Sequence, residues 1–193
     1  MHAGKARVFF ALWPDPGCAE RLQRIAARLA RDFGGRPMQQ STLHMTLAFV
    51  GDVDECRLPE LMTIAGLVQA ETAHRESQRW VLNRLAYWRH NRILWAGSDA
   101  TPPTLALLAG QLASGLTASG YAIPERPFLP HVTLVRKMNI EPESNPLCAL
   151  DESPQPWLYS DFALLRSPRD GQGGGYETLG SWTLHDPETM SIP

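Results

Sequence analysis

Two short segments of the chain carry the same pattern of side chains that could move protons. Residues 44–47 read His-Met-Thr-Leu, and residues 131–134 read His-Val-Thr-Leu. Successive side chains of a β-strand point to opposite faces, so the His and the Thr of each segment share one face. Two imidazoles and two hydroxyls facing one cleft would suit proton transfer into and out of a phosphoryl group.

The two histidines can supply an acid and a base together. An unperturbed imidazole has a pKa of ~6.5, so near neutral pH one ring can be neutral while the other is charged. His44 and His131 share a local context that the other histidines lack. We expect surface positions for the remaining four, which are His2, His74, His90 and His185.

The two threonines could hold a phosphate without a metal ion. Thr46 and Thr133 each lie two residues beyond a histidine on the same strand face, so their hydroxyls can donate to phosphate oxygens beside the imidazoles. Such donors stabilise the charge that develops on a pentacoordinate phosphorus. Because no Asp/Glu cluster has the spacing of metal ligands, we expect chemistry with no metal and no other cofactor.

The composition indicates a globular protein of one domain or two small lobes. The chain has 193 residues, of which 44% are hydrophobic and 20% charged. It contains no run of about 18 apolar residues and no signal-peptide pattern, so we expect a cytoplasmic protein with no membrane partner. Its formal net charge of −2 argues against coating of nucleic acid, but allows a local site for one terminal phosphate. The three cysteines lack disulfide or zinc spacing and are expected to be reduced: Cys18, Cys56 and Cys148.

The elements that must position these residues occur twice in the same order. Residues 7–12 predict a strand, residues 22–33 carry apolar side chains at helical spacing, and the His44 strand follows to Gly51. In the second half, residues 93–97 predict a strand, residues 105–116 repeat the helical spacing, and the His131 strand follows. The sequence therefore predicts an internal duplication, roughly residues 7–51 and 92–136.

Other segments complete the predicted architecture. We expect a further helix over roughly residues 57–73 and a hairpin within residues 80–95 that turns near residues 89–91. Residues 141–156 are rich in Pro, Glu and Ser and are expected to form a loop. Two closing strands, 161–165 and 177–184, are joined in this prediction by a flexible turn at residues 171–175.

These motifs resemble those of a known family, the 2H phosphoesterases. Residues 43–51 and 126–136 are similar to the family's first and second motifs, and residues 7–12 to its opening strand. Within the family, the chain resembles the bacterial and archaeal RNA 2′,3′-cyclic phosphodiesterases, long called 2′-5′ RNA ligases. The resemblance covers roughly residues 7–184.

The resemblance implies an α+β fold. Together with the duplication, it predicts two pseudo-symmetric lobes, each an antiparallel β-sheet with helices on its outer face. The active-site cleft would lie between the lobes. On this prediction residues 1–193 form a single bilobal domain.

The resemblance also implies a role for each site residue. His44 would be the proton donor to the leaving oxygen, and His131 the proton acceptor that activates water. Thr46 and Thr133 would hold phosphate oxygens, and Arg136 would contact the phosphate. Strict alternation places Arg136 on the face opposite His131, so it reaches the cleft only if the strand twists, bulges or ends first.

The implied function is metal-independent hydrolysis of RNA 2′,3′-cyclic phosphate ends to 2′-phosphates, with 2′-5′ RNA ligation as a possible side activity. The expected partners are RNA 3′ ends or related small cyclic phosphates, with no obligate protein partner. The alternatives are a small-molecule cyclic nucleotide phosphodiesterase and a non-catalytic RNA-end binding module. Residues that could line an RNA entrance or stack a terminal base are Arg89, Arg92, Arg126, Arg166, Arg169, Phe9, Tyr87 and Trp88.

Overall fold

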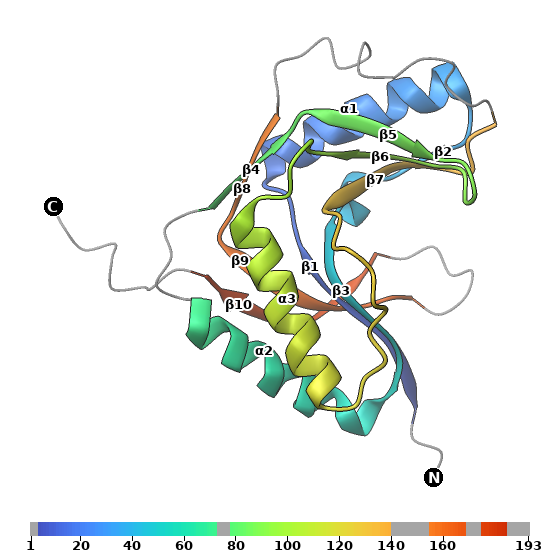
Figure 1. Ribbon diagram of the computed structural model, residues 1–193. Helices are drawn as coiled ribbons and strands as arrows, with labels where there is room; N and C mark the ends of the chain where they lie inside the picture. The colour runs from blue at the N-terminus through green and yellow to red at the C-terminus, as the bar shows by residue number, and fades with distance from the viewer. Residues whose placement is uncertain (1–3, 73–77, 140–154, 169–174, 185–193) are drawn as a thin grey trace, which may run out of the picture.

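The computed structural model describes residues 4–72, 78–139, 155–168 and 175–184. Most strands join one antiparallel sheet in the order β10-β9-β1-β3-β7-β6-β5, with β2 paired to β7 (Figure 1). In the part of the chain that is described, no helix is long and apolar enough to cross a membrane. The strands of this sheet are β1 (Lys5–Leu12), β2 (Arg36–Pro37), β3 (Met45–Asp54), β5 (Arg84–Trp88), β6 (Ile93–Gly97), β7 (His131–Arg136), β9 (Asp161–Arg166) and β10 (Glu177–Thr183).

The large sheet has two halves that meet at one narrow junction. Strands β1, β9 and β10 lie on the side of β3, whereas β2, β5 and β6 lie on the side of β7. Between the halves, β3 and β7 pair through Met45 and Val132. The expected α+β architecture with two lobes is therefore confirmed, and the lobes join beside the two histidine segments.

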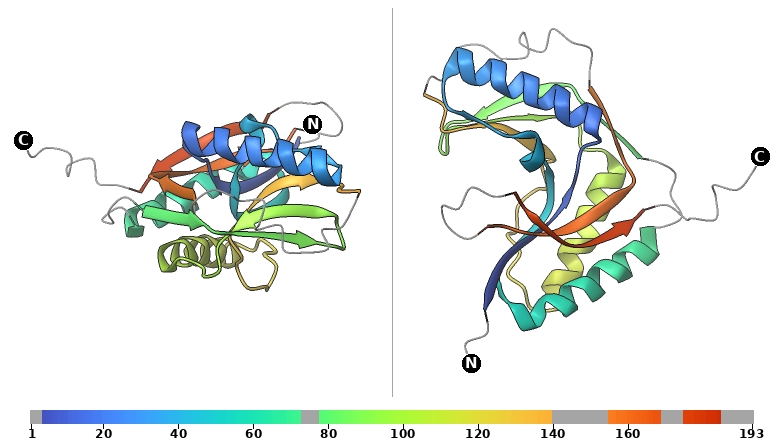
Figure 2. Two further views of the ribbon diagram at one scale, coloured as in Figure 1. Left: turned by 90° about the horizontal axis from the view of Figure 1, so that it is seen from above. Right: turned by 180° about the vertical axis from the view of Figure 1, so that it is seen from behind.

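Helices α1 (Pro16–Phe33) and α3 (Pro103–Ala118) each pack against the lobe opposite to the strand that precedes them in the chain. Helix α1 follows β1 in the chain, yet it packs against β7 and β2 of the opposite lobe (Figure 2). Helix α3 follows β6 and packs against β3, and also against α2 (Leu58–Thr72). All three helices were expected from the apolar spacing. Because the two helices that follow β1 and β6 exchange lobes, separating the lobes would expose both of their apolar faces.

Local sequence fixes where α1 begins and ends. The Asp15 carboxylate accepts a hydrogen bond of 2.9 Å from the Cys18 amide, and Pro16 occupies the first turn. Gly34 ends the helix at φ 73°, a left-handed backbone conformation that favours glycine. The helix thus ends just before β2 and the short 3₁₀ turn η1 (Gln40–Thr42), which precedes His44.

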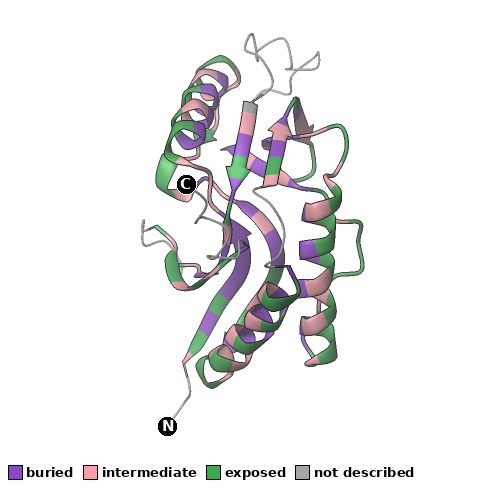
Figure 3. Cartoon of the chain, turned by 90° about the vertical axis from the view of Figure 1, so that its left-hand side faces the viewer, coloured by how far each residue is buried: buried purple, intermediate pink, exposed green. Residues whose placement is uncertain are grey.

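One large hydrophobic core lies between the sheet and the helices. Figure 3 shows buried residues along the central strands, with exposed residues on the outer faces of the helices. A smaller buried cluster occupies the other face of the sheet and consists of Phe9, Ala11, Ala163 and Leu165. Trp13 and Tyr176 pack against this smaller cluster, which forms part of the floor below His44.

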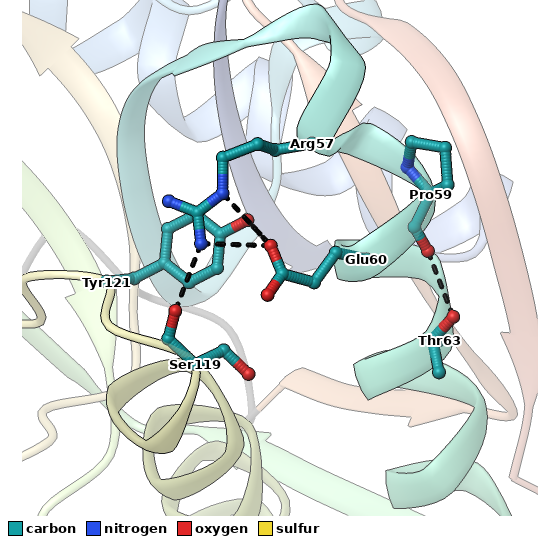
Figure 4. Close-up of polar contacts among 6 residues, drawn as sticks. All are labelled: Arg57, Pro59, Glu60, Thr63, Ser119 and Tyr121. Carbon is teal, nitrogen blue, oxygen red and sulfur yellow. Dashed lines mark hydrogen bonds and ion pairs between the residues drawn. The ribbon is translucent and has the colours of Figure 1, made fainter.

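A polar cluster ties the start of α2 to the end of α3 (Figure 4). It begins in the 3₁₀ turn η2 (Glu55–Arg57), where the Arg57 guanidinium lies 4.0 Å from the centre of the Tyr121 ring. The Tyr121 hydroxyl donates to Glu60 at 2.8 Å, and Arg57 donates to the Ser119 carbonyl at 3.0 Å. Burial, and then the Glu60 carboxylate, raise the pKa of Tyr121 to about 12.

The structure differs from the sequence expectation in two segments. The hairpin is β5–β6, whereas Trp80 belongs to β4 (Gln78–Leu82), which pairs with β8 (Gln155–Tyr159) in a separate two-stranded sheet. The last residues of the expected loop, 155 and 156, therefore belong to a strand, and residues 140–154 lie outside the described part of the chain. The closing strands are confirmed as β9 and β10. Of the turn expected at residues 171–175, all but Gly175 lie outside the described residues.

Candidate active site

The two histidines occupy equivalent positions at the starts of β3 and β7. Each Nδ1 atom lies 2.8 Å from the carbonyl oxygen two residues earlier, that of Thr42 for His44 and that of Leu129 for His131. A carbonyl oxygen only accepts hydrogen bonds, so Nδ1 carries the proton in both rings. Each Nε2 therefore accepts a proton when the ring is neutral and donates one when it is charged.

The strand junction brings these histidines to one face with the two threonines. Met45 and Val132 pair directly and both point into the core, where neither is accessible to solvent. The neighbours of this pair along each strand consequently point to the opposite face, where all four are half-buried. These four neighbours are His44, Thr46, His131 and Thr133.

A β-bulge determines where Arg136 points. Thr133 pairs with Trp95 and Val135 with the adjacent Leu94, so Leu134 is an extra residue in β7. Leu134 and Val135 are both fully buried, and the alternation therefore shifts by one residue. Arg136 consequently lies exposed on the same face as Thr133. Strict alternation would have placed it on the opposite face, so the bulge is what brings it to the side of the histidines.

Strand β3 contains the corresponding bulge. Thr46 pairs with Ala11 and Ala48 with the adjacent Phe10, so Leu47 is the extra residue. Phe49 therefore occupies the position on β3 that Arg136 occupies on β7. The Phe49 ring is 39% exposed, and the Arg7 guanidinium lies 5.2 Å from its centre. Phe49 was not expected as a site residue from the sequence. The available signal was the third residue after each motif threonine, which is Phe in one copy and Arg in the other.

Aromatic rings surround His44. Its ring centre lies 5.0 Å from that of Phe9, 4.9 Å from that of Tyr176 and 6.2 Å from that of Trp13. Phe9 is only 4% exposed, so it packs under the imidazole and is not available to stack a base. Trp13 and Tyr176 were not identified from the sequence, because neither is close to a motif in the chain.

Two tryptophan rings lie beside His131. Its ring centre lies 4.6 Å from that of Trp88 and 5.9 Å from that of Trp95. Trp88 is thus part of the site, whereas Tyr87 points toward the main core. Two unequal aromatic environments therefore surround two chemically equivalent histidines.

Burial and positive charge disfavour protonation of both histidines. Burial lowers the pKa of His44 to about 4, and the charges of Arg136 and His131 act in the same direction, while the Thr42 carbonyl opposes them. The pKa of His131 is also lowered, first by burial and then by Arg126 and Arg136, against the effect of the Leu129 carbonyl. Both rings are therefore neutral at pH 7 in the free protein, and Arg136 acts electrostatically on each.

The remaining arginines differ in their surroundings. Arg166 makes ion pairs with Glu55 at 3.6 Å and Glu177 at 3.2 Å, so it is not a free entrance cation. Arg126 is exposed and close enough to His131 to lower its pKa. Arg89 and Arg92 are exposed at the tip of the β5–β6 hairpin. Arg169 lies outside the described residues. Within the described ranges, no group of three or more His, Cys, Asp or Glu side chains could hold a metal ion.

Comparison with known proteins places this fold among the phosphoesterases. The chain superimposes on the crystal structure of Escherichia coli LigT complexed with 3′-AMP with a TM-score of 0.77 and 27% identity, over 93% of this chain and 98% of that one. The match to the apo form of LigT has the same TM-score and identity.

Sequence comparison identifies the family. The profile described as LigT like Phosphoesterase matches residues 12–95. The chain is 32% identical over 130 residues to the RNA 2′,3′-cyclic phosphodiesterase of Escherichia coli, which covers 67% of this chain and 71% of that protein. It is 27% identical over 188 residues to the enzyme of that name from Thermus thermophilus, covering 92% and 90%. The chain belongs to the LigT-like phosphoesterase family, which confirms the resemblance to 2H phosphoesterases.

The buried neutral state of His44 should make stability depend on pH. The folded protein keeps this ring neutral down to about pH 4, whereas the unfolded chain protonates it near pH ~6.5. The unfolded state therefore binds more protons in this window, and stability falls as the pH falls. We expect His44 to contribute about 2 kcal/mol of the loss between pH 7 and pH 5. Urea unfolding of wild type and His44→Asn at both pH values measures this, and an equal loss in the two proteins would contradict it.

Proposed function

We propose that this protein hydrolyses the 2′,3′-cyclic phosphate at RNA 3′ ends and leaves a 2′-phosphate, with no metal ion. The observation that carries the proposal is the pair of histidines on one sheet face, each with Nδ1 bound to a carbonyl and Nε2 left to move a proton. The name shared by the relatives from Escherichia coli and Thermus thermophilus supports the same substrate class. A cytoplasmic location stays a prediction of the sequence.

In the proposed reaction the two histidines have different tasks. Neutral His131 takes a proton from water through Nε2 while the water oxygen attacks phosphorus. His44, protonated on Nε2, gives that proton to the 3′ oxygen as its bond to phosphorus breaks. The site then returns to its starting state when His131 loses a proton and His44 gains one from solvent.

Binding of the anionic substrate would raise the pKa of His44 and so favour its protonation. In the free protein the charge of Arg136 lies near a ring whose pKa is already low. A cyclic phosphate anion bound between them offsets that charge and favours the imidazolium. Acid catalysis by His44 would therefore require a bound phosphate, although its pKa of about 4 alone would suit a base better than an acid.

The other residues of this face would hold the substrate. Thr46 and Thr133 donate to the non-bridging phosphate oxygens, and Arg136 neutralises charge as it builds up in the transition state. Phe49 presents an exposed ring on the same face, where a terminal base can stack. We further propose that residues 7–51 and 92–136 are copies of one unit within a single domain, since both place a histidine, a threonine and a bulged residue alike.

The remaining alternatives are separable by assay. RNA ligation would use the same residues in reverse, and measurement of both reactions on one substrate pair compares them. A small-molecule phosphodiesterase would prefer cyclic nucleotides to RNA ends. A binding module would show no multiple turnover with excess substrate.

Removal of either imidazole should abolish catalysis. We expect His44→Ala and His131→Ala each to lower kcat by at least the roughly 10²–10⁴-fold typical of general acid–base groups. The control is His90→Ala, since His90 is exposed in the turn of the β5–β6 hairpin. Near wild-type turnover in either site variant would exclude the two-histidine mechanism.

Loss of the hydroxyls should slow the reaction less. Thr46→Ala and Thr133→Ala should lower kcat by roughly one to three orders of magnitude, because the hydroxyls orient and stabilise without transferring a proton. Thr→Ser variants at the same positions should keep much of the activity. Loss of folding, measured by thermal unfolding, in place of loss of rate would show that the threonines serve packing alone.

Catalysis should need no metal. Activity should survive exhaustive dialysis against EDTA, because two imidazoles suffice for both proton transfers. The pH profile should be bell-shaped, since one histidine must be neutral and the other protonated. An absolute requirement for an added divalent cation, tested by titrating metal back, is the outcome that excludes this chemistry.

The product should be the 2′-phosphate. His44 would protonate the 3′ oxygen, so the bond from phosphorus to that oxygen breaks. Phosphorus NMR of a digested cyclic-phosphate oligonucleotide distinguishes the two isomers. If the 3′-phosphate dominates, the substrate binds in the reverse orientation, and the acid and base roles of His44 and His131 must be re-examined.

A further inference from the structure

A groove of about 650 Å³ opens beside His44, outside the face that holds the phosphate. This volume falls within the range of roughly 300–1,000 Å³ typical of small-molecule sites. Its walls come from three segments that the fold brings together: the residues that follow β1, the first turns of α1, and η1, which packs against α1. The residues that matter for its chemistry are Trp13, Pro14, Gln23, Gln39, Gln40 and Ser41.

The groove adjoins the candidate active site at Trp13. This ring lines the groove and also lies 6.2 Å from the His44 ring, centre to centre. The backbone of Trp13 is fixed by a hydrogen bond, in which the Trp157 indole donates to the Trp13 carbonyl at 3.2 Å. On the other side, η1 ends at Thr42, whose carbonyl binds Nδ1 of His44. A molecule in the groove would therefore lie next to the proposed acid.

The lining suits a nucleobase better than a phosphate. Of the described residues that line the groove, none carries a formal charge. Within the described part of the chain, the side-chain amides of Gln23, Gln39 and Gln40 make no hydrogen bond to the protein, so their donors and acceptors remain available to a ligand. An indole face beside amide groups is the combination that stacks a base and binds its polar edge.

We propose that this groove binds the base of the second nucleotide from the RNA end, so that the preferred substrate is an oligonucleotide and not a mononucleotide. This inference rests on the proposed function, because the direction in which the RNA leaves the site follows from the role of His44 in that reaction. His44 protonates the 3′ oxygen, so the terminal ribose lies on the His44 side of phosphorus. The RNA that precedes this ribose then leaves on the same side, where the groove lies, while Phe49 stacks the terminal base.

The test compares three substrates on the intact protein. They are adenosine 2′,3′-cyclic phosphate, the ApA dinucleotide with a terminal cyclic phosphate, and the same dinucleotide with an abasic first residue. We expect kcat/KM to be about tenfold higher for the dinucleotide than for the mononucleotide, and the abasic form to lose most of this gain. Equal values for mononucleotide and dinucleotide, or an abasic form as good as the dinucleotide, would overturn the proposal.

Variants of the groove residues test whether the preference for the dinucleotide arises in the groove. The double variant Gln39→Ala/Gln40→Ala should lower kcat/KM for the dinucleotide about threefold to tenfold and leave the mononucleotide unchanged. Gln69→Ala is the matched control, because Gln69 lies on α2, outside the groove. An unchanged dinucleotide preference in the double variant would overturn the assignment of the site. No hydrolysis of any substrate by wild type would instead exclude the proposed function, so the two failures are distinct.

Discussion

The site depends on two half-buried imidazoles that are held in one fixed orientation. Each ring is bound at Nδ1 by the carbonyl two residues earlier in its own chain segment. The backbone of the strand start therefore aims Nε2 without help from another side chain. Aromatic rings that pack beside both imidazoles exclude part of the water that would stabilise their charged forms. In the proposed mechanism, a bound phosphate anion supplies the negative charge that favours the protonated form of His44.

The sheet is irregular at the places where this arrangement requires it. A regular β7 would direct Arg136 into the core side of the sheet, and a regular β3 would do the same with Phe49. One extra residue in each strand, Leu134 and Leu47, reverses the alternation and returns both side chains to the face of the histidines. The crossing of α1 and α3 between lobes secures the narrow β3–β7 junction, on which the spacing of the histidines depends.

Much of this could be predicted from the sequence, because the decisive signals are local. The His-x-Thr alternation identified the faces of β3 and β7, and the apolar spacing identified all three helices. Signals that depend on distant pairing were not available. The bulges at Leu47 and Leu134 appear only when the partner strands are known. Tyr176 and Trp13 contact His44 only because of the order in which the strands assemble into the sheet. Trp80 pairs with Trp157 in a separate sheet, and the local sequence pattern of its strand could equally have formed a hairpin.

The central claim is that a bound phosphate, and not the protein alone, allows His44 to carry a proton. The most direct measurement is an NMR pH titration of the His44 and His131 ring nitrogens, without ligand and with saturating adenosine 2′-phosphate. We expect both rings to be neutral at pH 7 in the free protein, with the proton on Nδ1. With ligand, the pKa of His44 should rise by roughly 1 to 3, as expected for a nearby opposite charge. A His44 pKa that is already near 7 without ligand, or that does not move when the ligand binds, would contradict the account.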